Sequence, residues 1–280
     1  MKPGSLRAAG LGLLAALALF TPFRAAAADP PASWLDRGYH DLYDLEFNQA
    51  HRAFQQWEQL RPEDPLGPAS DAAAYLFSEF DRLHILESEL FVDDAAFEHR
   101  SRPAADPLAK RSFDAQIAKA GGLIDAALAR NPDDFNALFS QVLVFGLQCD
   151  YQALIEKHDL RALSYAKQGR ILAQKLLSRD PAYYDAYLAI GVENYLLSLK
   201  PAPVRWVLKI AGAETDKETG LAKLRLTAEK GHYMQPYARL LLAVAALRDH
   251  NQEQARALLE GLAREFPHNH LYWQELAKLR

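Results

Sequence analysis

Apolar residues recur every three or four positions along most of the chain, which is the spacing of one face of an α-helix. The stretch 69–90 shows this clearly, because its alanine, leucine, isoleucine and phenylalanine residues follow helical intervals. The pattern therefore predicts an all-α fold. The expected helices span about 34–45, 47–60, 69–90, 108–130, 135–149, 160–178, 203–211 and 216–230, followed by a last hairpin and an ending helix.

Residues with helix-boundary chemistry support these limits. Ser33 and Asn269 precede the first and last helices, and their side chains are good N-caps. Thr215 is followed three residues later by a glutamate, which is the spacing of a capping box and predicts an N-cap there. Gly121 and Gly122 fall inside an expected helix, where each is unfavourable by about 1 kcal/mol relative to alanine. We therefore expect close helix packing around these two glycines.

The first two expected helices carry a spaced set of small and aromatic residues. Gly38 and Ala50 are small, so two antiparallel helices could approach closely where they lie. Trp34 and Phe54 are expected to fill the space beside that crossing, and Pro62 lies where a residue without an N–H cannot extend the second helix. One such hairpin cannot bury its apolar faces alone, so the pattern predicts an array of hairpins.

Parts of the same spacing return further along the chain. Tyr187 and Gly191 occupy the slots of the first aromatic residue and its glycine. The separations between successive closing prolines are 70, 49 and 86 residues, so the repeats are divergent and carry insertions. The largest insertion spans about 199–212, and an irregular loop is expected at about 92–107. The closing prolines are Pro62, Pro132, Pro181 and Pro267.

The segment 34–62 resembles a tetratricopeptide repeat, whose pattern is W-x2-L-G-x2-Y, then A-x3-F, then P. Arg37 and Asp41 replace the usual Leu and Tyr. The resemblance also covers 251–273 and, less fully, 116–191. It implies a right-handed α-solenoid of divergent helical hairpins, whose concave groove binds a peptide or helix of another protein. Repeat alignment implies that the groove is lined by Leu35, Tyr39, Leu42, Phe139, Leu143 and Tyr195.

Residues 1–28 have the features of a secretory signal peptide. Lys2 and Arg7 precede an apolar run at 8–20, which is too short to span a bilayer comfortably, and small residues at 25–28 offer cleavage sites. The alternative is an uncleaved anchor. We expect residues 29–280 to form one helical-repeat domain, exported to the periplasm or secreted. The chain resembles exported tetratricopeptide-repeat proteins of Gram-negative bacteria, a comparison that implies no activity.

Composition and charge narrow the class of partner. Half of the 280 residues are hydrophobic and 24% are charged, which is typical of a globular protein. The formal net charge is −4, and no basic block occurs. Nucleic acid is therefore not the expected partner. The single cysteine, Cys149, excludes an intrachain disulfide, which fits a bacterial periplasm.

No motif in the chain indicates catalysis, a metal or another cofactor. His84 and Glu87 lie one turn apart and could share a metal, but the alternative is a solvated helix face that runs into an acidic loop. The H-E-x-x-H, G-x-S-x-G, phosphate-loop and dinucleotide patterns are absent. We therefore expect a protein that is not an enzyme and needs no cofactor. The other members of the His/carboxylate group are Glu89, Asp93, Asp94, Glu98 and His99.

Two polar positions interrupt an apolar helix near the insertion. Glu193 and Asn194 need partners if they are buried. Either they tie this helix to the insertion that follows, or they line the groove. Within the insertion, Arg205, Trp206 and Lys209 form a cationic and aromatic stretch that either contacts lipid or a partner protein, or packs on the array.

These observations predict a non-catalytic scaffold that binds another protein or peptide in the cell envelope. One alternative is a small-ligand or enzymatic protein with its site near 199–212, and another is a membrane-associated assembly factor. A single deep pocket with convergent polar groups would favour a small ligand, whereas a long open groove would favour the scaffold.

Overall fold

The structure is a computed structural model that describes residues 33–86, 104–200, 202–210 and 212–279. The predicted signal peptide and most of the predicted irregular loop lie outside these residues. The described part of the chain is helical and contains no strand, so the all-α prediction is confirmed there. In the same residues, no helix combines the length and the apolar character needed to cross a membrane.

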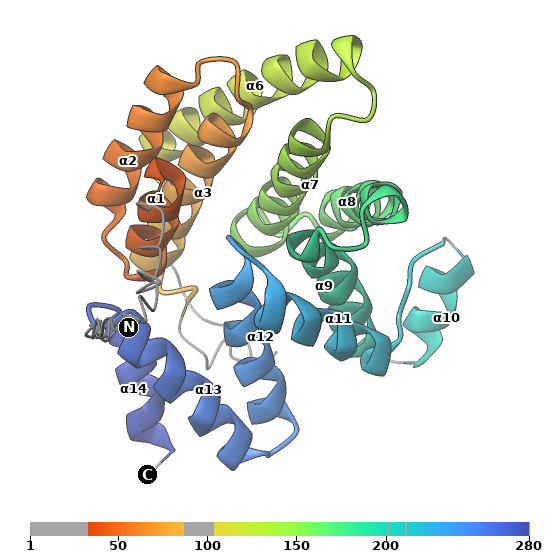
Figure 1. Ribbon diagram of the computed structural model, residues 1–280. Helices are drawn as coiled ribbons and strands as arrows, with labels where there is room; N and C mark the ends of the chain where they lie inside the picture. Colours follow the sequence, from red (N-terminus) through yellow and green to blue (C-terminus); the bar gives the residue numbers. More distant parts are fainter. Residues whose placement is uncertain (1–32, 87–103, 201, 211, 280) are drawn as a thin grey trace, which may run out of the picture. The chain divides into compact units, whose positions relative to one another are not determined.

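Apart from α10, helices that follow one another in the described chain pack side by side (Figure 1). The most extensive contacts are those of α7 with α8, α9 with α11, α3 with α6, and α1 with α2. A π-helical turn, Tyr151–Ile155, follows α7, and a 3-10 turn, Tyr184–Ala186, precedes α9. The helices are α1 (Trp34–Tyr43), α2 (Phe47–Leu60), α3 (Leu66–Arg82), α6 (Pro107–Arg130), α7 (Phe135–Asp150), α8 (Asp159–Arg179), α9 (Tyr187–Ser198), α10 (Ala202–Ile210), α11 (Lys217–Lys230), α12 (Gln235–Arg248), α13 (Gln252–Glu265) and α14 (His270–Lys278).

One predicted helix is wrong in both of its limits. The helix expected at 69–90 begins earlier, at Leu66, because a proline is tolerated in the first turn of a helix. It ends at Arg82, because His84 adopts a left-handed backbone conformation with φ of 55°. Ile85 follows in the core with no exposed surface, so the chain turns inward where continued helix was expected.

The predicted caps are confirmed at both ends of the described chain but not before α11. The side chains of Ser33 and Asn269 accept hydrogen bonds from the first turns of α1 and α14. The N-cap predicted at Thr215 is wrong. Asp216 caps α11 instead, and its carboxylate accepts a 2.7 Å hydrogen bond from the backbone N–H of Thr219. An aspartate is a stronger cap than a threonine, which accounts for the shift by one residue.

The crossing of α1 and α2 uses the small residues as predicted. Gly38 faces the ring of Phe54 so closely that an added Cβ atom would overlap that ring, and Ala50 and Phe54 have no exposed surface. Trp34, however, does not fill the crossing. It is 36% exposed, and the guanidinium group of Arg37 lies over its ring at 5.0 Å.

The close packing predicted around Gly121 and Gly122 is also wrong. An added Cβ atom at either position would meet no atom within 4 Å. Both glycines lie on α6, and this helix packs through other residues such as Phe113 and Ile124. These glycines therefore lower helix stability without a packing contact that compensates for them.

The apolar interior falls into one large cluster and two smaller ones. The large cluster runs from α1 and α3 through α7 to α12, α13 and α14. A smaller cluster joins α9, α11 and α12, where Gly191 approaches Leu224 and Tyr195 is 2% exposed. The candidate site described below lies within the large cluster, where helices distant in the sequence meet.

Candidate functional site

A cavity of about 110 Å³, here called the central cavity, lies among helices from most of the described chain. Its walls come from α1, α3, α7, α8 and α9, with the beginning of α12. The lining is predominantly apolar. Representative wall residues are Leu42, Ala73, Phe139, Val142, Leu143 and Leu188.

Gly146 keeps one wall of the central cavity open. It lies on α7, is exposed, and would have no atom within 4 Å of an added Cβ. Gly169 on α8 also lines the cavity, but an added Cβ there would lie 3.6 Å from the Cβ of Phe145. Gly169 therefore serves the packing of α7 against α8, whereas Gly146 leaves free space.

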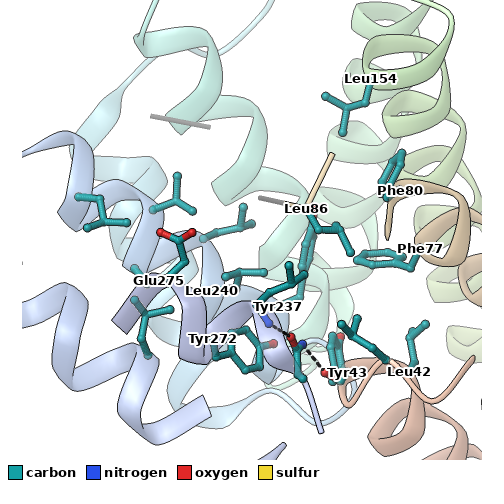
Figure 2. Close-up of a pocket in the computed structure, with 18 residues that line it drawn as sticks. Leu42, Tyr43, Phe77, Phe80, Leu86, Leu154, Tyr237, Leu240, Tyr272 and Glu275 are labelled. Atoms are coloured by element: carbon teal, nitrogen blue, oxygen red, sulfur yellow. Dashed lines mark hydrogen bonds between the residues drawn. The ribbon is translucent and has the colours of Figure 1, made fainter. Parts of the chain in front are cut away.

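A second cavity of about 60 Å³, here called the side cavity, adjoins the first. The two cavities share four wall residues: Leu42, Tyr43, Phe77 and Tyr237. Figure 2 shows the side chains around the side cavity, which come from α1, α3, α12 and α14 among other segments. Because the shared residues form a common wall, the two cavities form one apolar region of the interior.

Most polar groups in the wall of the central cavity already have partners. The Tyr39 hydroxyl accepts a 2.9 Å hydrogen bond from Ser70, and the Tyr43 hydroxyl donates to the carbonyl oxygen of Tyr233 at 2.8 Å. The carboxylate of Asp185 accepts hydrogen bonds of 2.8–3.1 Å from three consecutive backbone N–H groups just before α12. These groups hold the walls together rather than present free polar atoms.

Glu193 and Asn194 tie α9 to the segment after α10. Glu193 accepts a 2.9 Å hydrogen bond from Arg170, which also donates to the carbonyl oxygen of Gly212 at 2.8 Å. Asn194 donates to Glu214 at 2.8 Å. Burial raises the pKa of Glu193, and the guanidinium group of Arg170 opposes that rise. Of the two roles that the sequence left open for Glu193 and Asn194, a tie between this helix and the segment that follows is thus observed. Glu193 also lines the central cavity.

Asp150 differs from the other carboxylates in the wall. It is the last residue of α7, and its carboxylate has no hydrogen-bond or ion-pair partner among the described residues. Burial raises the pKa of Asp150 to about 7. The pKa values of the neighbouring Cys149 thiol and Tyr237 hydroxyl are also raised, chiefly by burial, so both groups stay protonated at neutral pH. The described wall residues include no Lys, Arg or His.

Four of the six predicted groove residues meet in the central cavity: Tyr39, Leu42, Phe139 and Leu143. The other two do not line it. Leu35 is 2% exposed and lies beside a shallow cleft that also involves Trp57 and Tyr183. Tyr195 packs in the core between α9, α11 and α12, where its hydroxyl has no hydrogen-bond partner.

The three candidates from the insertion lie on α10, which buries none of its residues. Trp206 is 67% exposed and Lys209 is exposed, whereas Arg205 is half-buried and donates to backbone carbonyls before the helix. None of them lines the central or the side cavity. The sequence left open that residues 205–209 pack on the other helices. This packing is not observed.

The residues that sequence reasoning missed are Gly146, Asp150 and Tyr237. Asp150 lies one residue beyond the helix expected at 135–149, although α7 includes it. The available signal was an acid at the end of an unusually apolar helix. Most of the predicted His/carboxylate group lies outside the described residues, and no group of three or more potential metal ligands occurs within them.

Comparison of the chain with protein-family models, curated proteins and solved structures gave no match. The function proposed below therefore rests on the geometry of the chain alone.

Proposed function

We propose that this protein is a non-catalytic binding protein that takes up the apolar part of a small ligand in its central cavity. The supporting observation is an apolar cavity of about 110 Å³ whose wall is left open at Gly146. For scale, an engineered apolar cavity of about 150 Å³ in another protein admits benzene. A ligand group the size of one aromatic ring is thus a reasonable occupant.

The wall chemistry favours binding over catalysis. Enzyme sites usually combine a nucleophile or a general base with groups that stabilise developing charge. In this cavity burial raises the pKa of the Cys149 thiol, which disfavours the nucleophilic thiolate, and the Asp185 and Glu193 carboxylates accept hydrogen bonds from their partners. The wall is predominantly apolar and encloses a cavity rather than a long open groove, which favours a small ligand.

Gly146→Leu tests this function. The leucine side chain should fill the space beside α7 and abolish binding of benzyl alcohol, used as an apolar probe. Because no atom lies within 4 Å of the added Cβ, and leucine favours a helix more than glycine does, the melting temperature should stay equal or rise. Ligand-observed NMR titration measures the binding. A matched Gly261→Leu variant on α13, where an added Cβ also has open space, should bind like the wild type. Retained binding in Gly146→Leu would contradict the proposed site.

Recognition of another protein is the second function that we propose, and α10 supports it. Trp206, Val207 and Ile210 fall on one face of this helix and are 59–68% exposed. Exposed apolar stripes at helical spacing commonly mark contact surfaces. As part of the same proposal, we propose that the helices form a divergent tetratricopeptide-like array in the cell envelope. The paired helices and the contact between Gly38 and Phe54 support this architecture.

Trp206→Ser combined with Ile210→Ser tests this second function. We expect loss of a partner identified by affinity capture from a periplasmic extract, with little change in thermal stability, because neither residue is buried. Leu160→Ser is the matched control, since Leu160 is 86% exposed on α8. If the double variant captures the same partner as the wild type, α10 is not its contact surface.

A further inference from the structure

We infer that the central cavity selects ligands whose apolar part carries a cationic ammonium group, and that the carboxylate of Asp150 binds this group. The inference rests on the proposed small-ligand function, because it specifies the chemistry of a ligand for the same cavity. Four observations support it: the position of Asp150, the absence of a competing partner, the size of the cavity and the charge of its wall.

Asp150 is placed to meet an occupant of the cavity. It ends α7, one turn after Gly146, so the opening in the wall and the carboxylate lie on the same helix. The π-helical turn Tyr151–Ile155 begins directly after it. Single π-helical turns inside helical segments often lie at functional sites.

The carboxylate has no partner within the described protein, whereas the other two carboxylates in the wall do. Asp185 is bound by three backbone N–H groups, and Glu193 is bound by Arg170. An ionised carboxylate without a partner in an apolar wall is unfavourable, because its charge is partly removed from water, and Asp150 is half-buried. A ligand ammonium would supply the missing donor and the opposite charge.

The remaining titratable groups favour a cation over an anion. No basic side chain occurs among the described wall residues, so an anionic ligand would find no partner there. Burial raises the pKa of Asp150 to about 7, which agrees with a group that lacks a partner in the free protein. The titratable wall residues that share the cavity with Asp150 are Tyr39 and Tyr43 of α1, Cys149 of α7, Tyr165 of α8, Asp185, Glu193 of α9 and Tyr237.

Benzylamine, benzyl alcohol and benzoate form a matched set of probes, since they share one ring and differ in the polar end. For the full chain at pH 7.5, we expect benzylammonium to bind about tenfold more tightly than benzyl alcohol, because the ammonium brings an opposite charge to the carboxylate in addition to a hydrogen-bond donor. Benzoate should bind most weakly. In Asp150→Asn the ratio of the benzylammonium and benzyl alcohol affinities should fall to about 1.

A pH titration of the wild type supplies a readout that needs no variant. Below pH 7 the ionised fraction of Asp150 falls about tenfold per pH unit, so benzylammonium affinity should fall with it, and benzyl alcohol affinity should fall less. Thermal melts establish that each variant is folded. If Asp150→Asn does not fold, a benzylammonium affinity that stays constant between pH 7.5 and pH 6 would overturn the role of Asp150.

The outcomes separate the two proposals. Equal affinities for benzylammonium and benzyl alcohol, both lost in Gly146→Leu, would overturn the role of Asp150 and leave the proposed ligand cavity intact. Tighter binding of benzoate would also overturn it. Absence of binding by all three probes would overturn the proposed function, and this inference with it. A benzylammonium preference that survives in folded Asp150→Asn would show that another group binds the cation.

Discussion

Arg170→Met should lower the free energy of unfolding by about 3–5 kcal/mol, because it leaves a buried carboxylate without its charged partner. The side chains of Arg170 and Glu193 are only 8% and 1% exposed, and their hydrogen bond measures 2.9 Å. The same guanidinium group donates to the carbonyl oxygen of Gly212, so the substitution also releases the segment after α10. Urea unfolding of the variant and the wild type measures the difference.

Arg179→Met provides a matched control on the same helix. Arg179 pairs with Asp133 at 3.0 Å, but these side chains are 55% and 45% exposed. Exposed pairs of this kind contribute about 0–1 kcal/mol, so the control should unfold close to the wild type. Similar urea midpoints for Arg170→Met and Arg179→Met would mean that the buried pair does not hold α8 to α9.

Gly38→Leu should strongly destabilise the crossing of α1 and α2. A side chain at this position would overlap the Phe54 ring, which has no exposed surface into which it could move. Overpacking of a core costs about 1–3 kcal/mol and occasionally more. Gly191→Leu should act in the same direction, because an added Cβ would lie 2.9 Å from Leu224. Chemical unfolding monitored by circular dichroism measures both effects.

Gly122→Leu is the control that separates packing from helix propensity. An added Cβ at Gly122 meets no atom within 4 Å, and leucine favours the helix by somewhat less than about 1 kcal/mol relative to glycine. This variant should be as stable as the wild type or more stable. If Gly38→Leu matched Gly122→Leu in stability, α1 and α2 would not cross as described.

The sequence alone determined the features that depend on neighbouring residues. Helical periodicity predicted α2, α7, α8 and α11 to within a few residues, because an amphipathic face is encoded by local spacing. The caps at Ser33 and Asn269 were equally local. The contact of Gly38 with Phe54 was also predictable, since both residues belong to one hairpin.

The tertiary structure alone decided which residues share a cavity. Tyr39, Phe139 and Tyr237 are distant in the sequence and come together only when α1, α7 and α12 pack. Local patterns also could not show that Gly121 meets open space, because it is a glycine within a helix just as Gly38 is. Local patterns also could not show that the Asp150 carboxylate lacks a partner, because this depends on which side chains the surrounding helices bring near it. Side chains on separate helices meet only when those helices pack together. The spacing of residues along one helix determines which side chains share a face of that helix, but it does not determine which other helix that face contacts.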